Sequence, residues 1–327
     1  MARIAIDAMG SDNGSKMVVA AVKKYKHDFP ETEFFVCGRE EELVELKGIA
    51  TIIHAEDVMG MEDGALAVMR NRNTSMYKAC ELVANGTCDG VVSAGGTGAF
   101  LTCATIKLKL IEGIQRACLC TTFPTSDGKG VTILDIGANN ENQPEHLVQF
   151  AKIGEVYCKK VRNIPEPNIY LLSNGAEDKK GSPLIKATNP LLREKNQYFR
   201  GNLEARYALT GQADVIVCPG FEGNVLLKST EGAAKMVGGL VSDAFRKNIF
   251  TKIGYLFARK GIKEMKKIMD YKQYGGAMLL GVNGAVVKAH GNSDEVSFYA
   301  AIKYAHLMIT NDVVNKIKEE FINEKNN

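Results

Sequence analysis

Gly90-Val91-Val92-Ser93 leads directly into Ala94-Gly95-Gly96-Thr97-Gly98, so a short apolar run enters a glycine-rich turn before a stretch of helical character. Two later apolar runs enter a turn in the same way: VTILDI at 131–136 before GANN at 137–140, and DVIVC at 214–218 before PGFEGN at 219–224. A strand, a glycine turn and a helix in succession leave unpaired backbone N–H groups at a helix N-terminus, where the helix dipole favours an anion.

The three turns also carry polar side chains, namely those of Ser93, Asn139 and Asn224. One glycine turn of this kind is typical of any α/β protein, but three with polar residues favour a phosphate or oxyanion site. In an open parallel sheet ligands bind at the carboxyl ends of the strands. We therefore expect the three turns to gather at one edge of a sheet.

Strand-like and helix-like stretches alternate along nearly the whole chain of 327 residues. Strands are expected at 4–7, 33–37, 51–54, 90–93, 117–122, 131–136, 168–172, 214–218 and 285–288. Helices are expected at 15–27, 75–85, 98–110, 144–161, 183–195, 293–306 and 312–321, before a frayed polar tail at 319–327. The alternation predicts one α/β domain over 1–327, with a mostly parallel sheet between two layers of helices.

No strand is visible between 224 and 272, and we expect a helical insertion at about 225–272, interrupted at Gly238-Gly239, Gly254 and Gly261. Residues 246–272 hold nine Lys or Arg and two acids, a charge of +7 in a chain of net charge +3, so the rest carries −4. The positive charge is therefore local, which argues against a body that binds nucleic acid.

Large apolar residues recur at helical spacing within this basic segment: Ile249, Phe250, Ile253, Leu256 and Phe257. They fit a helix pair buried in a dimer interface, and they also fit a helical tip that docks on an anionic membrane. The two roles can coexist. An acidic carrier protein is a rival partner for the same positive charges.

Several classes of protein are disfavoured. No run of 18 apolar residues could span a membrane, and the N-terminus reads as a strand rather than a signal peptide, so a cytosolic protein is expected. The eight cysteines contain no C-x-x-C and sit mostly in apolar runs, as small buried hydrophobes do.

Common catalytic motifs are also missing. Leu227 precedes Lys228-Ser229 where a P-loop needs glycine, Leu101 replaces the third glycine of a dinucleotide fingerprint, and no G-x-S-x-G occurs. The five histidines are never paired at the spacing of metal ligands, so no metal is expected. Together with the missing nucleotide motifs, this means that no cofactor is expected. A site that handles phosphate without nucleotide, metal or covalent nucleophile suits a reaction in which phosphate itself attacks.

Ordered motifs over nearly the full length resemble those of the phosphate acyltransferase (PlsX) family. They are DAMG at 7–10, SAG at 93–95, TGA at 97–99, LDIGAN at 134–139, PEH at 144–146, EDKKG at 177–181, GNLEAR at 201–206, GFEGNV at 220–225, YGGA at 274–277 and KAHG at 288–291. The resemblance implies a fold like that of isocitrate and isopropylmalate dehydrogenases, shared with phosphotransacetylases, and a homodimer. Two residues depart from the family pattern: Gly96 replaces asparagine and Ser11 replaces glycine.

The resemblance also implies an activity and its partners. The enzyme would transfer a fatty acyl group from acyl carrier protein to inorganic phosphate, for use by a membrane glycerol-3-phosphate acyltransferase. A thiol with a pKa of ~8.5 leaves readily, so the enzyme needs mainly to position two anionic centres. The alternatives are a short-chain phosphotransacetylase that uses coenzyme A, and a non-catalytic protein that binds membrane or carrier.

By the resemblance, Lys180 neutralises phosphate or the oxyanion, and Asn224 donates its amide. Taken alone, Lys180 also fits a solvated lysine in a turn, and Asn224 fits a helix N-cap. Further binding residues are expected in the turns and at two strand ends: Asp7, Ser93, Gly95, Gly96, Thr97, Gly98, Asn139, Gly223 and His290. Asp7 could instead be a turn or cap residue, and His290 a buried, hydrogen-bonded residue or a base.

Overall fold

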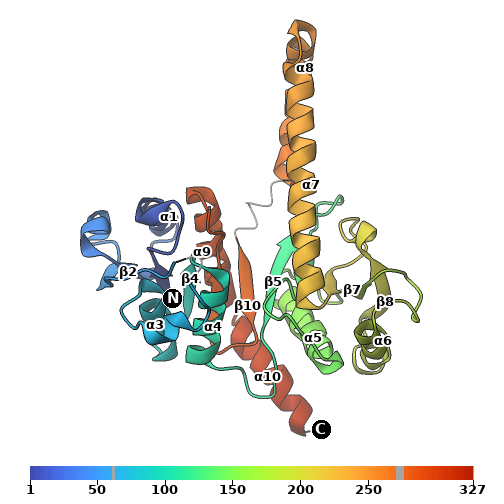
Figure 1. Cartoon of the computed structure of the whole chain (residues 1–327), viewed down its shortest axis with the longest axis horizontal. Coiled ribbons are helices and arrows are strands. Elements are labelled where there is room, and N and C mark those ends of the chain that lie inside the picture. Colours follow the sequence, from blue (N-terminus) through green and yellow to red (C-terminus); the bar gives the residue numbers. More distant parts are fainter. Residues whose placement is uncertain (61–62, 270–275, 327) are drawn as a thin grey trace.

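The computed structural model describes residues 1–60, 63–269 and 276–326, and shows one sheet covered by helices, with a long helical pair projecting from it (Figure 1). Residues 270–272 of the predicted insertion, which include the basic Lys272, lie outside the described residues. So do Tyr274 and Gly275 of the YGGA motif.

In the part of the chain that the structure describes, one sheet of eleven strands runs in the order β3-β2-β1-β4-β11-β10-β5-β6-β9-β7-β8. Its strands are β1 Arg3–Asp7, β2 Glu33–Gly38, β3 Thr51–His54, β4 Gly90–Ser93, β5 Cys118–Phe123, β6 Val131–Leu134, β7 Ile169–Ser173, β8 Phe199–Glu204, β9 Val215–Val217, β10 Ala277–Leu280 and β11 Ala285–Lys288. The mostly parallel sheet is confirmed. Two strands, β8 and β10, were not expected from the sequence.

The direction of the strands reverses at the centre of the sheet. β3, β2, β1, β4 and β11 are mutually parallel, and so are β6, β9, β7 and β8. Three antiparallel pairs lie between the two sets: β11 with β10, β10 with β5, and β5 with β6. The two halves therefore point their carboxyl ends at opposite edges. The expectation that all three glycine turns share one edge is wrong, because the turn after β4 lies opposite those after β6 and β9.

Helices cover both faces of the sheet, as predicted. They are α1 Gly14–Asp28, α2 Ala67–Arg70, α3 Ser75–Ala84, α4 Thr97–Leu108, α5 Pro144–Lys160, α6 Pro183–Lys195, α7 Gly220–Arg246, α8 Ile249–Met269, α9 Glu295–Thr310 and α10 Val313–Asn326, with 3-10 turns at Glu40–Glu42, Val44–Leu46 and Ala205–Tyr207.

Neighbouring strand residues separate into two buried clusters, one on each face. Val92 belongs to the cluster that includes buried residues of α1, α5 and α9, whereas Val91 belongs to the cluster that includes those of α3 and α4. This division follows from the alternation of side chains along a strand. All eight cysteines are free and buried, as expected. None of the helices in the described ranges combines enough length and apolar character to cross a bilayer.

The insertion is an antiparallel pair of long helices, α7 and α8, that projects from the rest of the molecule (Figure 1). The expected interruptions at Gly238-Gly239, Gly254 and Gly261 are wrong, because each glycine lies inside a continuous helix. Helix α7 ends at Arg246, and Asn248 caps α8 by accepting from the N–H of Thr251. A glycine costs a helix only ~1 kcal/mol, which a long helix tolerates.

The C-terminal tail is also more ordered than predicted. Helix α10 extends to Asn326, well beyond the predicted end at 321. Phe321 and Ile317 are buried on one face of this helix, four residues apart. This apolar contact anchors the helix, so much of the polar stretch from 319 onward continues it rather than fraying.

Candidate active site

A cavity of about 650 Å³ lies over the antiparallel centre of the sheet, and we call it the central cavity. Thr97 and Gly98 at the start of α4 line it, as do Asn224 in the first turns of α7 and His290 after β11. Strand β5 contributes Leu119 to its floor. Helices α4 and α7 begin at opposite edges of the sheet, and their first turns meet over its middle. The glycine turns therefore lie around one cavity, in an arrangement that the sequence did not predict.

The turn after β4 is held from behind by a buried carboxylate. Asp7 accepts hydrogen bonds from Ser75 Oγ at 2.5 Å and from Ser93 Oγ at 2.6 Å. The N–H of Gly95 in turn donates to Ser93 Oγ at 3.0 Å. Asp7, Ser93 and Gly95 are buried and are not among the residues that line the central cavity. They position the turn whose next residues, Thr97 and Gly98, face the cavity.

Gly96 occupies the N-cap position of α4, where its carbonyl accepts from the N–H of Phe100 at 3.0 Å. It has no side chain that could cap the helix, unlike the asparagine that the resemblance leads one to expect at this position. Ser11, the second departure, donates to the carbonyl of Gly291 at 3.3 Å. It therefore helps to tie the loop after β1 to the turn that carries His290.

A second buried carboxylate, Asp135, organises the turn after β6. It accepts from the N–H of Leu119 and from the N–H groups of Ala138 and Asn139, each at 2.9 Å. Burial raises the pKa of Asp135, and these donors oppose that shift. The amide of Asn139 donates to Asp135 and to the carbonyl of Ala117, both at 2.8 Å. Asn139 thus holds the turn and lines a smaller neighbouring cavity rather than the central one.

Two lysines that the sequence analysis did not assign line the central cavity. Lys288 at the end of β11 is 8% exposed, and its Nζ donates to the carbonyl of Ala289. Burial lowers the pKa of Lys288 to about 8, while Asp7 and Asp12 oppose this shift. Lys228 of α7 pairs with Glu231 at 3.1 Å. A signal existed for Lys288, since a lysine that ends an apolar strand beside a predicted site residue is a candidate ligand for an anion.

His290 lies next to the same carboxylate, with its Nε2 3.6 Å from Glu231 Oε1. Burial lowers the pKa of His290, and Glu231 opposes the shift. One side of the cavity thus carries three positive or potentially positive groups, those of Lys228, Lys288 and His290. Among the described residues that line it, Glu231 supplies the one carboxylate. This arrangement suits a multiply charged anion such as phosphate.

Comparison with known proteins identifies the family. The family model described as "Fatty acid synthesis protein" matches residues 2–316. The chain belongs to this family. It is 41% identical over 321 residues to the protein named "Phosphate acyltransferase" of Lysinibacillus sphaericus, with 97% of each chain covered.

Solved structures show that the fold extends beyond this family. A phosphotransacetylase from Streptococcus pyogenes superposes with a TM-score of 0.62 at 18% identity, covering 94% of both chains. A 4-hydroxythreonine-4-phosphate dehydrogenase from Klebsiella pneumoniae gives 0.55 at 10% identity, over 94% of this chain and 99% of that one. The expected likeness in fold to phosphotransacetylases is confirmed.

Lys180, expected from the family motif, is not among the residues that line the central cavity. It lies in the turn after β7, is exposed, and its backbone N–H donates to the carbonyl of Glu177 at 2.9 Å. Strand β7 is next to β9, so Lys180 shares the sheet edge from which α7 and Asn224 start. Asn224 is not the N-cap of α7, which is Pro219.

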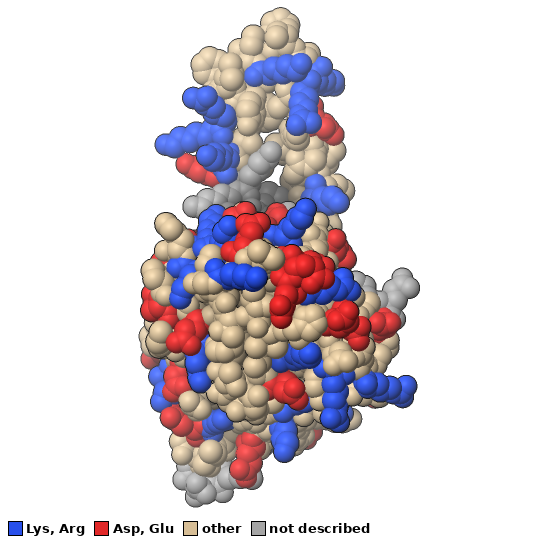
Figure 2. Space-filling model, turned by 90° about the vertical axis from the view of Figure 1, so that its left-hand side faces the viewer, with Lys and Arg blue, Asp and Glu red and all other residues tan. Residues whose placement is uncertain are grey.

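The apolar residues of the basic segment are exposed on the projecting pair, which we call the hairpin. Phe250 and Phe257 are 80% and 87% exposed, and Ile249, Ile253 and Leu256 are also exposed. Helix α8 begins at the end of the hairpin far from the sheet, so Ile249 and Phe250 lie near its tip (Figure 1). Lys and Arg side chains gather along the hairpin, with uncharged residues at its very end (Figure 2).

Gly223, which was expected to bind substrate, has a clear packing role. A Cβ at this position would lie 1.9 Å from the carbonyl oxygen of Asp135 and 2.8 Å from Cys218 Sγ. The close approach seats the first turn of α7 on the turn after β6, and so sets the position of Asn224.

We expect Gly223→Ala to destabilise the protein by about 1–3 kcal/mol, since overpacking a tight contact forces the backbone to shift. Gly232→Ala on the same helix is the matched control. No atom of the residues that the structure describes lies within 4 Å of the Cβ it would add, so it is expected to stabilise by up to ~1 kcal/mol through helix propensity. Thermal unfolding measures both. Equal melting temperatures for the two variants would contradict the packing role.

Proposed function

We propose that the central cavity transfers a fatty acyl group from acyl–acyl carrier protein to inorganic phosphate, giving acyl phosphate for phospholipid synthesis. The main support is the 41% identity, over nearly the whole chain, to a protein named phosphate acyltransferase. The cavity agrees with this activity, because it combines two lysines with two helix starts and is large enough for two reacting groups.

In this proposal phosphate is held by Lys288 and Lys228 and by the N–H groups at the start of α4. A phosphate oxygen attacks the thioester carbon, the new C–O bond forms, and the C–S bond breaks. The carrier thiolate leaves with the bonding electron pair and takes a proton from solvent. Asn224 donates its amide to the oxyanion that develops on the carbonyl oxygen, where one such donor is typically worth ~10²–10³ in rate.

Lys180 is also part of this proposal: it would neutralise phosphate or the oxyanion together with Asn224. Its exposed turn lies at the edge of the sheet near the start of α7, so this role requires the turn to move toward the cavity. The charge of Lys180 would then reach the site only with substrate bound, as is common for groups on mobile loops.

The experiment that tests this function follows the carrier thiol. The protein is incubated with palmitoyl–acyl carrier protein, with and without phosphate, and the free thiol is measured. We expect release that needs phosphate and is unaffected by a chelator or by added nucleotide. Preference for acetyl coenzyme A over the carrier substrate would favour the phosphotransacetylase alternative, and no turnover would favour a binding protein.

We also propose that the hairpin pairs with that of a second copy in a homodimer and brings its tip to an anionic membrane. The support is the exposed row of Phe250, Ile253 and Phe257 beside Lys252 and Arg259. Cytoplasmic location with peripheral membrane contact would suit an enzyme that passes acyl phosphate to a membrane glycerol-3-phosphate acyltransferase. Acidic acyl carrier protein is the rival partner for these charges.

We expect Ile253→Asp to weaken binding to anionic vesicles roughly tenfold to a hundredfold, since a buried large apolar side chain is worth about 1.5–3 kcal/mol. Turnover of the soluble carrier substrate should stay nearly unchanged. Ile322→Asp on α10 is the matched control, since Ile322 is 45% and Ile253 47% exposed. Co-sedimentation measures all three proteins. If Ile253→Asp loses carrier-dependent activity but keeps vesicle binding, the hairpin binds acyl carrier protein rather than the membrane.

A further inference from the structure

A second cavity of about 420 Å³ adjoins the central cavity, and we call it the side groove. The two share Phe123 at the end of β5 and Glu231 of α7. The carboxylate of Glu231 lies 3.1 Å from Lys228 Nζ and 3.6 Å from His290 Nε2, and both of these residues line the central cavity. The charge of Glu231 is therefore engaged on that side, which leaves the groove beyond it predominantly apolar.

One wall of the side groove is a face of α7. Thr230, Ala234 and Val237 all line it, and their spacing of four and three residues places them on one side of the helix. The opposite wall comes from Phe123, Pro124 and Leu209. Because Ala234 is small, the groove stays open at its middle.

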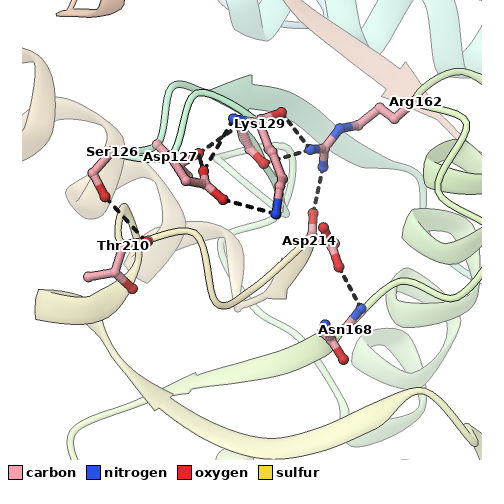
Figure 3. Close-up of polar contacts among 9 residues, drawn as sticks. Ser126, Asp127, Lys129, Arg162, Asn168, Thr210 and Asp214 are labelled. Carbon is pink, nitrogen blue, oxygen red and sulfur yellow. Dashed lines mark hydrogen bonds and ion pairs between the residues drawn. The ribbon is translucent and has the colours of Figure 1, made fainter.

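Polar contacts hold the loop after β5, which contributes to the opposite wall (Figure 3). The N–H of Ser126 donates to the carbonyl of Leu209 at 2.9 Å, and Ser126 Oγ donates to the carbonyl of Thr210 at 3.3 Å. Arg162 donates to the carbonyls of Lys129 and Asp214, at 2.9 and 2.8 Å. The groove is thus already formed in the free protein, which lowers the cost of ordering a ligand in it.

We infer that the side groove binds the fatty acyl chain of the substrate, with the thioester in the central cavity and the chain passing between Phe123 and Glu231. The inference rests on the proposed function, which supplies a long apolar chain attached to the reacting carbon. Another cavity beside the central cavity, of about 260 Å³, is lined by Arg116 and Asn139 as well as by apolar residues. It is smaller and carries charge, so it suits an alkyl chain less well.

The test fills the groove with a larger side chain. Ala234→Phe is compared with wild type in phosphate-dependent turnover of palmitoyl– and butyryl–acyl carrier protein. We expect kcat/KM for the palmitoyl substrate to fall on the order of 100-fold relative to the butyryl substrate, as loss of burial for three or four methylenes implies. Thr105→Phe in the other neighbouring cavity is the control, and should leave this ratio unchanged.

An unchanged ratio in Ala234→Phe, or a shift in Thr105→Phe instead, overturns the inference while leaving the proposed function intact. Binding of cis-parinaric acid, a fluorescent fatty acid, gives a readout that does not depend on turnover. Wild type should bind the probe and Ala234→Phe should bind it at least tenfold more weakly, with circular dichroism confirming that the variant is folded. If wild type turns over neither substrate, the proposed function fails. If wild type and Ala234→Phe bind the probe equally well, the inference that the side groove binds the acyl chain is overturned.

Discussion

Replacing Lys288 by methionine is expected to lower kcat/KM for phosphate by on the order of 10²–10³, the usual cost of removing one preorganised electrostatic group from an active site. Lys288 is buried at the end of β11 and lines the central cavity. Methionine keeps most of the apolar length of the side chain and removes the charge. The fold should therefore survive, and Lys16→Met on the exposed side of α1 serves as the control for a lost surface charge.

The pH dependence gives this prediction a second readout. Because the pKa of Lys288 lies at about 8, the charged form that attracts phosphate is lost as pH rises through that value. Wild-type kcat/KM for phosphate should thus decline above about pH 8, and the Lys288→Met variant should lack that decline. A variant with nearly full activity and an unchanged profile would show that Lys288 does not contact phosphate.

Asn224→Ala is expected to lower kcat by on the order of 10²–10³, with little change in stability. Asn224 is exposed toward the central cavity in the first turns of α7, and its Cβ region faces Gly137 of the turn after β6. Its amide is thus available to an oxyanion that exists only during reaction, so kcat rather than KM should respond.

Single-turnover rates with circular dichroism test this role, and Ser229→Ala on the same helix is the control. By the family motif Lys180→Ala should cause a similar loss. If Lys180→Ala is nearly wild type while Asn224→Ala is impaired, the turn after β7 does not close over the cavity. Normal turnover in both variants would remove both residues from the mechanism.

The layered α/β fold was predictable because it depends on local patterns. The apolar runs that end in the glycine turns are buried strands, and Ser182 and Asp294 cap α6 and α9 through hydrogen bonds to N–H groups three residues later. What local patterns do not encode is strand direction. The reversal depends on β10, a short strand that precedes β11 and pairs with it in antiparallel fashion. Its sequence gives no clear indication of a strand.

The lining of the central cavity was predicted in part. One cavity is indeed lined by Thr97, Gly98, Asn224 and His290. The polar atoms of the other three residues, Asp7, Ser93 and Asn139, instead make hydrogen bonds that hold the turns. A sequence cannot separate these two uses, since both need a polar residue at the same turn. Lys228 was missed because its role depends on how α7 lies over the reversed sheet. Lys288 had a signal in its place at the end of an apolar strand beside His290, and the sequence analysis did not use it.

The central claim is that phosphate itself attacks the thioester in this protein, and the oxygen atoms of the product test it most directly. Palmitoyl–acyl carrier protein is incubated with the enzyme and phosphate made wholly with heavy oxygen, and the product is analysed by mass spectrometry. The account predicts palmitoyl phosphate that retains all the heavy oxygens of the phosphate, formed together with an equal amount of carrier thiol. Thiol release accompanied by unlabelled free palmitate, with no palmitoyl phosphate, would contradict it.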